Sequence, residues 1–141
     1  MTKIVCVQPL QLLPDQKARL ETLGEVTYYD ERTKNSEEWL ERTKGHDVVL
    51  TGVFGIVDKW KELRDIFVSL PFVGVGWADP QVLKEHNVTI SNSPGCNKHA
   101  VAEWIIGMLL MMTRELDKYL NIKEMPFNKM PPAGFGWPGK K

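Results

Sequence analysis

The sequence predicts an α/β fold, a five-stranded parallel sheet with helices on both faces. Two observations lead to this prediction. Short apolar runs rich in β-branched residues alternate along the chain with segments whose apolar residues recur at helical spacing. The short runs are apolar on both faces, as strands are when a parallel sheet is covered on both sides. The length of 141 residues suffices for one compact domain with its own core.

Proline and glycine positions mark the first elements. Lys3–Val7 reads KIVCV, which is short, apolar and β-branched, so we expect a strand there. Pro14 suits the first position of a helix, and Gly24 suits the stop after it. The run EVTYYD at residues 25–30 is predicted to be the second strand.

The middle of the chain repeats this rhythm. We expect a helix that starts at Ser36 and stops at Gly45, followed by a third strand over residues 47–53, DVVLTGV. Residues 58–70 are predicted to form a helix that packs on one side, through Trp60, Leu63, Ile66 and Phe67.

Two further strands complete the predicted sheet. The fourth is expected at residues 71–76, PFVGVG, and the fifth at residues 88–91, VTIS. Between them Pro80 opens a short helix over residues 80–86. The expected sheet is therefore complete at Asn92.

The rest of the chain divides into a long helix and a tail. We expect a helix over residues 97–121 that is apolar almost all round from Ala100 to Met112, with Glu103 as its one charge there. Such a helix must be covered on several sides. Residues 122–141 are rich in proline, glycine and aromatic residues, and irregular structure is expected.

Composition excludes several classes of partner. Eighteen basic residues balance eighteen acidic ones, so no long-range field favours nucleic acid or an anionic membrane. The longest apolar stretch without a charge, Trp104–Met112, is far shorter than the ~20 residues that span a bilayer.

Cys6 and Cys96 lack any metal-ligand spacing and are expected to be free thiols. Met1 leads directly into a strand without a leader, so a cytoplasmic protein is expected.

Three loops at the carboxyl ends of the predicted strands could bind a ligand. They read TGVFG at residues 51–55, GVGWAD at 74–79 and NSPGCN at 92–97. Glycine there lets the main chain approach a ligand or adopt positive φ, so that N–H groups converge on a carboxylate or phosphate. The alternative is turn chemistry alone, and NSPGCN could be a helix start with Asn97 as N-cap.

No catalytic or metal motif accompanies these loops. GVGWAD lacks the third glycine of a dinucleotide fingerprint, and no acidic residue ends a strand about 20 residues later. The histidines at positions 46, 86 and 99 have no partner acid or nucleophile in the sequence and are expected to be solvated. The residues alone therefore indicate an α/β domain able to hold a small ligand.

Residues 92–103, NSPGCNKHAVAE, together with the order of the segments from residue 3 to about 120, resemble the N-terminal part of the NAD-dependent D-2-hydroxyacid dehydrogenases. The resemblance implies that residues 1–96 form a flavodoxin-like substrate domain and that the helix over residues 97–121 runs between domains and contributes to a homodimer interface. It implies that the main-chain N–H groups of Gly74, Val75 and Gly76 meet the carboxylate of a small 2-hydroxy or 2-oxo acid. Val53 and Phe54 would line the pocket.

The resemblance also implies what this chain lacks. In the family, NAD or NADP binds a separate nucleotide domain, and the catalytic arginine, glutamate and histidine lie in or beyond that domain. The end of the sequence, WPGKK, resembles the approach to its first strand. We therefore expect an isolated substrate domain, with no cofactor site and no catalytic residue of its own, that is inactive as an oxidoreductase.

Two alternatives differ in class. One is a self-associating or partner-binding module that pairs through the apolar helix without catalysis, and such a module would have no need of GVGWAD. The other is an FMN-binding flavodoxin. It is disfavoured because the turn after the first strand, QPLQLLPD, offers no hydroxyl groups for a phosphate.

Overall fold

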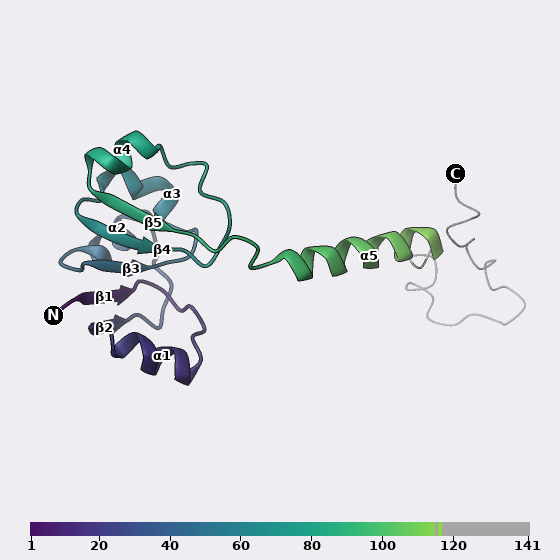
Figure 1. Ribbon diagram of the computed structural model, residues 1–141, viewed down its shortest axis with the longest axis horizontal. Coiled ribbons are helices and arrows are strands. Elements are labelled where there is room, and N and C mark those ends of the chain that lie inside the picture. Colours follow the sequence, from purple (N-terminus) through teal and green to yellow (C-terminus); the bar gives the residue numbers. More distant parts are fainter. Residues whose placement is uncertain (115, 117–141) are drawn as a thin grey trace, which may run out of the picture. The chain divides into compact units, whose positions relative to one another are not determined.

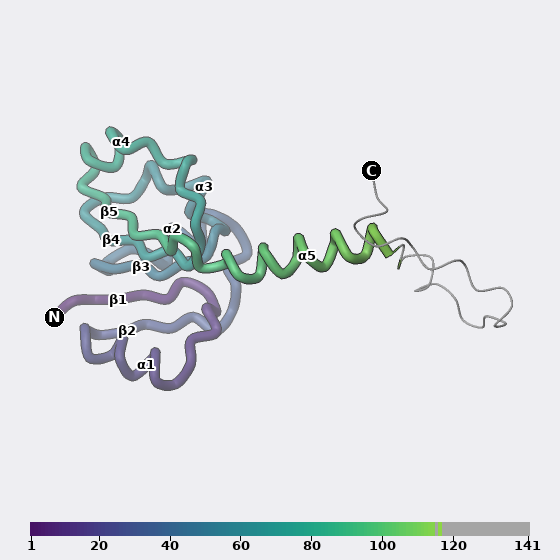
Figure 2. The backbone as a smooth tube through the Cα atoms, turned by 45° about the vertical axis from the view of Figure 1, so that its right-hand side comes forward, coloured from purple at the N-terminus to yellow at the C-terminus, as the bar shows by residue number. Residues whose placement is uncertain are grey.

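A computed structural model describes residues 1–114 and 116 of the chain. Its five strands form one parallel sheet in the order β2-β1-β3-β4-β5 (Figures 1 and 2). This is the flavodoxin-like order, so the predicted fold class is confirmed. The strands are β1 (Lys3–Cys6), β2 (Glu25–Tyr28), β3 (Val48–Leu50), β4 (Ile66–Ser69) and β5 (Val88–Ser91).

The helices lie on both faces of the sheet because of the strand order. They are α1 (Pro14–Glu21), α2 (Ser36–Thr43), α3 (Ile56–Lys59), which a 3-10 turn (Trp60–Glu62) continues, and α4 (Pro80–Glu85). The step from β1 to β2 crosses the sheet in the opposite direction from the later steps. Since such crossovers are right-handed, α1 falls on one face and α2, α3 and α4 fall on the other.

The main core lies between the sheet and α2, α3 and α4. Neighbouring residues Val5, Val49, Val68 and Ile90 form one row across four strands and face this core. Trp39 of α2 and Ile56 of α3 are fully buried against it. The alternate row, Ile4, Val48, Phe67 and Thr89, faces the α1 side. Ile4 is buried there, but Phe67 is 38% exposed.

The predicted starts of three helices are confirmed, each with a local cause. Pro14 opens α1, Ser36 opens α2 and Pro80 opens α4. The side chain of Asn35 accepts a hydrogen bond from the Glu38 N–H at 2.8 Å, which caps α2. Gly45 follows α2 with φ 73°, the left-handed conformation that glycine adopts without strain.

Two predicted elements between residues 58 and 76 are wrong. The helix expected over residues 58–70 ends at Glu62, and residues 66–69 are strand β4. Asp65 has φ 51°, a conformation that a right-handed helix cannot contain. Trp60, Leu63 and Ile66 do pack in the core, but Phe67 points to the opposite face because side chains alternate along a strand.

The segment 71–76, expected to be the fourth strand, follows β4 as a loop. Leu70 is the last residue there whose N–H bonds to a neighbouring strand, through Ser91 O at 2.8 Å. The glycine loop therefore starts beyond the sheet and is held by other groups, which are described below.

Contacts divide the chain into two units, residues 1–96 and 97–141, and the second unit contains α5 (Lys98–Arg114). Its 17 residues are the described part of the helix expected over residues 97–121. Large apolar side chains of α5 are exposed, among them Val101, Trp104, Ile105, Ile106, Leu110 and Met112. No helix in the described part of the chain is long and apolar enough to cross a membrane. The expected irregular segment, residues 122–141, lies outside the described residues.

Cys6 and Cys96, both free thiols as expected, should differ in reactivity. Burial raises the pKa of the Cys6 thiol to about 11, against a smaller opposing effect of Lys17. At pH 8 only about one Cys6 side chain in a thousand would be the reactive thiolate. We expect a maleimide to modify the exposed Cys96 of the folded protein within minutes, and Cys6 only in denaturant, as mass spectrometry would show. Rapid labelling of a folded Cys96→Ser variant would contradict this burial.

Candidate functional site

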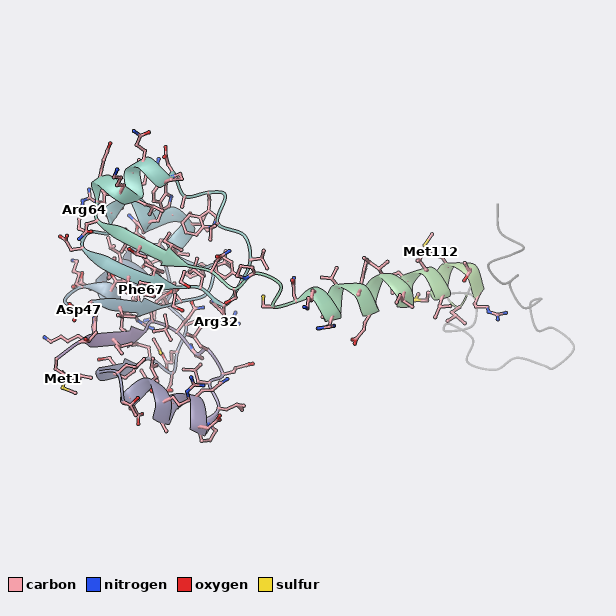
Figure 3. All side chains as sticks on the ribbon, in the orientation of Figure 1. Met1, Arg32, Asp47, Arg64, Phe67 and Met112 are labelled. Atoms are coloured by element: carbon pink, nitrogen blue, oxygen red, sulfur yellow. The ribbon has the colours of Figure 1, made fainter. Side chains whose placement is uncertain are left out.

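Three loops meet at the carboxyl edge of the sheet, where the strands of Figure 1 end. Residues 51–55 follow β3, residues 74–79 lie between β4 and α4, and residues 92–96 follow β5. The strands β3, β4 and β5 are neighbours, about 4.8 Å apart. Figure 3 shows Arg32, which follows β2, on this side of the sheet, whereas Asp47 and Arg64 lie at the amino ends of the strands.

The side chain of Trp39 of α2 holds the loop after β3 in place. The indole Nε1–H of Trp39 donates to Thr51 Oγ1 at 2.8 Å, and neither side chain is exposed. Thr51 in turn donates to Gly52 O at 3.0 Å. Gly55 has φ 84°, and a Cβ atom there would lie 2.2 Å from Trp39 Cγ. The loop thus closes over the indole, and only glycine fits at position 55.

This closure leaves the tip of the loop in solvent. Val53 is 59% exposed and Phe54 is 48% exposed, at the two positions that the sequence resemblance assigned to the pocket. Gly52, just before Val53, is covered by the side chain of Gln8, which follows β1. A Cβ at Gly52 would lie 2.3 Å from Gln8 Nε2. The loop after β3 therefore presents two apolar side chains beside a carboxamide.

The loop after β4 presents main-chain donors. The N–H groups of Gly74, Val75 and Gly76 have no acceptor among the residues that the structure describes. By contrast, the carbonyls of Gly74 and Val75 do have donors, Trp77 Nε1–H at 3.2 Å and Ala78 N–H at 3.1 Å. In this loop the carbonyls of Gly74 and Val75 thus have hydrogen-bond donors, whereas three successive N–H groups are available to a ligand.

The glycines of this loop differ from Gly55. A Cβ at Gly74 or Gly76 would meet nothing within 4 Å, and neither residue has positive φ. Left-handed backbone, expected from glycine in these loops, occurs at Gly55 and Gly95 but not at Gly74 or Gly76. Nothing in the described residues needs glycine at 74 and 76, so the space beside them is open to a ligand.

The turn after β5 packs against the segment that leads into this loop. The main-chain N–H of Ser93 donates to Phe72 O at 3.0 Å, and its hydroxyl donates to Leu70 O at 2.9 Å. Cys96 Sγ lies 3.6 Å from Pro71 O. The motif singled out in the sequence therefore braces the neighbouring glycine loop. The N-terminal carbonyl of α5 at Asn97 accepts from the Val101 N–H at 2.9 Å.

Charged groups near the edge are largely engaged in structural roles. Arg42 of α2 donates through Nη1 to Val7 O and Glu31 O, each at 2.8 Å, and lies over the ring of Tyr29 at 4.1 Å. Its Nη2 pairs with Glu38, whose carboxyl pKa is lowered first by the Lys34 N–H and then by Arg42. The carboxylate of Asp79 caps α4 by accepting from the Gln81 N–H at 2.8 Å.

Lys17 and Arg32 at this edge form no ion pair with a carboxylate of the described residues. Lys17 of α1 lies 4.9 Å from the ring centre of Tyr28 and borders a hollow of ≈ 180 Å³ between the ends of β1 and β2. Gln8 and Asp30 also line this hollow. Its place is on the far side of β3 from the glycine loop.

Histidine and metal chemistry find no support in the described residues. His46 and His86 precede β3 and β5 and so lie at the amino edge, away from the three loops. No group of three or more potential metal-ligating side chains occurs in the part of the chain that the structure describes.

Residues 4–117 match the family model described as D-isomer specific 2-hydroxyacid dehydrogenase, catalytic domain. The chain belongs to this family. The resemblance inferred from residues 92–103 is thereby confirmed. The glycine loop and the turn after β5 lie within the residues that match the catalytic-domain model of this family.

Curated relatives are longer than this chain. The erythronate-4-phosphate dehydrogenase of Pseudoalteromonas translucida is 31% identical over 122 residues, which cover 79% of this chain and 31% of the relative. The enzyme of the same name from a Marinomonas species is 31% identical over 111 residues, covering 74% and 28%. The chain thus spans about a third of the length of these relatives.

Solved structures share the fold. An acyclic imino acid reductase in complex with NADPH and D-Arg superposes with a TM-score of 0.71 at 19% identity, covering 92% of this chain and 44% of the reductase. The NAD+-bound 3-phosphoglycerate dehydrogenase of Entamoeba histolytica gives 0.59 at 21% identity, covering 89% and 42%. At these identities the likeness establishes the fold alone.

The contrast between Gly55 and Gly74 predicts that substitution by alanine destabilises the protein at position 55 but not at position 74. Gly55→Ala places a Cβ against the Trp39 ring and strains a positive φ, so we expect a loss of about 2 kcal/mol or more in the free energy of unfolding. Gly74→Ala meets no atom and should change stability by less than about 0.5 kcal/mol. Urea unfolding followed by Trp fluorescence measures both. Equal losses in the two variants would show that Trp39 does not close the loop.

Proposed function

We propose that this chain forms the substrate-binding part of an NAD- or NADP-dependent oxidoreductase that acts on a small 2-hydroxy or 2-oxo acid. The observation that carries this proposal is the row of open N–H donors at Gly74, Val75 and Gly76. Successive main-chain N–H groups bind carboxylates well, because several donors converge on one anion. Membership of the dehydrogenase family supports the same reading.

The loop after β3 would hold the body of the substrate. Val53 and Phe54 lie in the loop after β3, the strand next to β4, and expose apolar surface. Residues 51–55 contain no charged side chain, so this loop offers a phosphate no cationic partner. We therefore propose an acid whose remaining part is small and uncharged.

The glycine loop and the start of α4 do not fit a dinucleotide. A pyrophosphate site needs a glycine turn that opens directly onto a helix N-terminus with available N–H groups. Here α4 has six residues, starts at Pro80, which lacks an N–H, and is already capped by the carboxylate of Asp79. We propose that the nicotinamide cofactor is held by residues outside this segment, as in the family, and that this chain alone transfers no hydride.

Titration with glycolate tests the carboxylate site. We expect the backbone amide signals of residues 74–76 to shift in ¹⁵N–¹H spectra as glycolate is added, and those of 53 and 54 to follow, with a millimolar Kd. Glycolamide, which has the same size but no negative charge, is the control and should leave residues 74–76 unshifted. The same sample should not oxidise NADH in the presence of glyoxylate. Absence of glycolate shifts, or ordinary enzymatic turnover, would refute the proposal.

A second proposal concerns assembly, and α5 carries it. Trp104 is 65% exposed and Ile106 is 58% exposed within a helix that has apolar side chains on all sides. Surfaces of this kind associate. We propose that the chain is a homodimer through residues 97–121, and that it acts in the cytoplasm, where its two thiols would stay reduced.

Light scattering coupled to size exclusion tests the dimer. We expect the wild-type chain to elute as a dimer at micromolar concentration and Ile106→Asp to be monomeric, with at least about a 100-fold weaker association, since a buried unpaired carboxylate opposes the contact. Leu23→Asp, at an equally exposed apolar position after α1, is the matched control and should remain dimeric. A monomeric wild type at micromolar concentration would contradict the assembly.

A further inference from the structure

We propose that Asn92 and Trp77 are positioning residues that orient the N–H groups of Gly74 and Val75 toward the substrate carboxylate. The inference rests on the proposed function of the glycine loop. Its starting point is the planarity of the trans peptide bond, in which the carbonyl of one residue and the N–H of the next point in opposite directions. A group that fixes a carbonyl therefore fixes the direction of the following N–H.

Asn92 fixes the first peptide. Its side-chain Nδ2 donates to Val73 O at 2.7 Å, the shortest of the contacts between the turn after β5 and the glycine loop. The half-buried Asn92 thus draws the Val73 carbonyl toward β5. The N–H of Gly74, on the same peptide, must point the other way.

Trp77 fixes the second peptide. Its indole Nε1–H donates to Gly74 O at 3.2 Å, which directs the N–H of Val75 away from the indole. The indole is itself held by the core, because its ring lies 6.1 Å from that of the buried Trp60 at an interplanar angle of 59°. The orientation of the Val75 N–H is therefore anchored in the hydrophobic core.

The third peptide is fixed by the main chain. The N–H of Ala78 donates to Val75 O at 3.1 Å, which leaves the N–H of Gly76 opposite. Three consecutive carbonyls, those of residues 73–75, are thus each held by a donor, and the three N–H groups that follow them have no acceptor in the described chain. An anion site requires this arrangement, because its N–H donors must be available to the anion and its carbonyl oxygens must not face the anion.

The chemistry of position 92 supports a positioning role. Asparagine provides a neutral donor, whereas aspartate of the same shape could only accept at neutral pH and would repel both the Val73 carbonyl and a substrate carboxylate. The turn also offers a matched comparison, since the Ser93 hydroxyl donates to Leu70 O, whose peptide partner Pro71 has no N–H to orient.

The experiment compares Asn92→Ala and Trp77→Phe with the control Ser93→Ala. Trp77→Phe keeps an aromatic ring against Trp60 while it removes the N–H donor, so it tests the inference even where Asn92→Ala fails to fold. In ¹⁵N–¹H titrations of the whole chain with glycolate, we expect about a tenfold higher Kd for each of the first two, equivalent to one lost hydrogen bond. Ser93→Ala should bind as the wild type does, whatever its stability.

A second readout separates this inference from the proposed function. In ¹⁵N relaxation of the ligand-free proteins, we expect Asn92→Ala to raise the mobility of the Gly74 amide and Trp77→Phe that of the Val75 amide, with no change in Ser93→Ala. Failure of the wild type to bind glycolate would refute the proposed function, and the relaxation data would still decide whether the two side chains orient the amides. Unchanged amide mobility and unchanged affinity in both variants would overturn the inference.

Discussion

Main-chain groups at the carboxyl edge of a parallel sheet have no hydrogen-bond partner on a neighbouring strand. The rest of the described structure depends on which other groups provide those hydrogen bonds. Buried or half-buried carbonyls there need donors. Arg42 supplies them to Val7 O and Glu31 O and so joins the ends of β1 and β2 to α2. The turn after β5 supplies them to the segment after β4. Side chains of distant segments thereby set the shape of each loop.

The same constraint explains why two adjacent loops use glycine for different reasons. At Gly55 the backbone is left-handed and the Trp39 ring occupies the place of a Cβ, so the fold itself requires glycine. At Gly74 the backbone is ordinary and the space is empty. Glycine costs conformational entropy on folding, and the described chain does not need it at position 74. Close approach of a carboxylate, as proposed above, would give glycine a use there.

Sequence reasoning succeeded where the signal was local. Pro14, Ser36 and Pro80 marked helix starts because helix ends are governed by neighbouring residues. It failed over residues 58–76, since Trp60, Leu63 and Ile66 are spaced by three and fit a helix, although the left-handed Asp65 separates a helix from a strand. The run Ile66–Val68, made of β-branched and aromatic residues, was the missed signal for a strand.

The ties that shape the candidate site could not be found from sequence. The glycine loops were visible as motifs, whereas Trp39 to Thr51, Arg42 to Val7 and Asn92 to Val73 join residues 12, 35 and 19 positions apart. By contrast, Glu38 and Arg42 are four residues apart on one helix, a spacing from which an ion pair can be read.

The geometry also determines what this domain contributes to recognition. The glycine loop offers neutral donors that water can reach, and such donors give direction more than affinity. Lys17, which forms no ion pair among the described residues, borders the hollow at β1 and β2, with β3 between that hollow and the loop after β4. Two strand spacings, roughly 10 Å, exceed the reach of an ion pair. Under the proposed function, the domain would orient the acid, and a cationic group placed opposite these N–H donors would supply the stronger attraction for its charge.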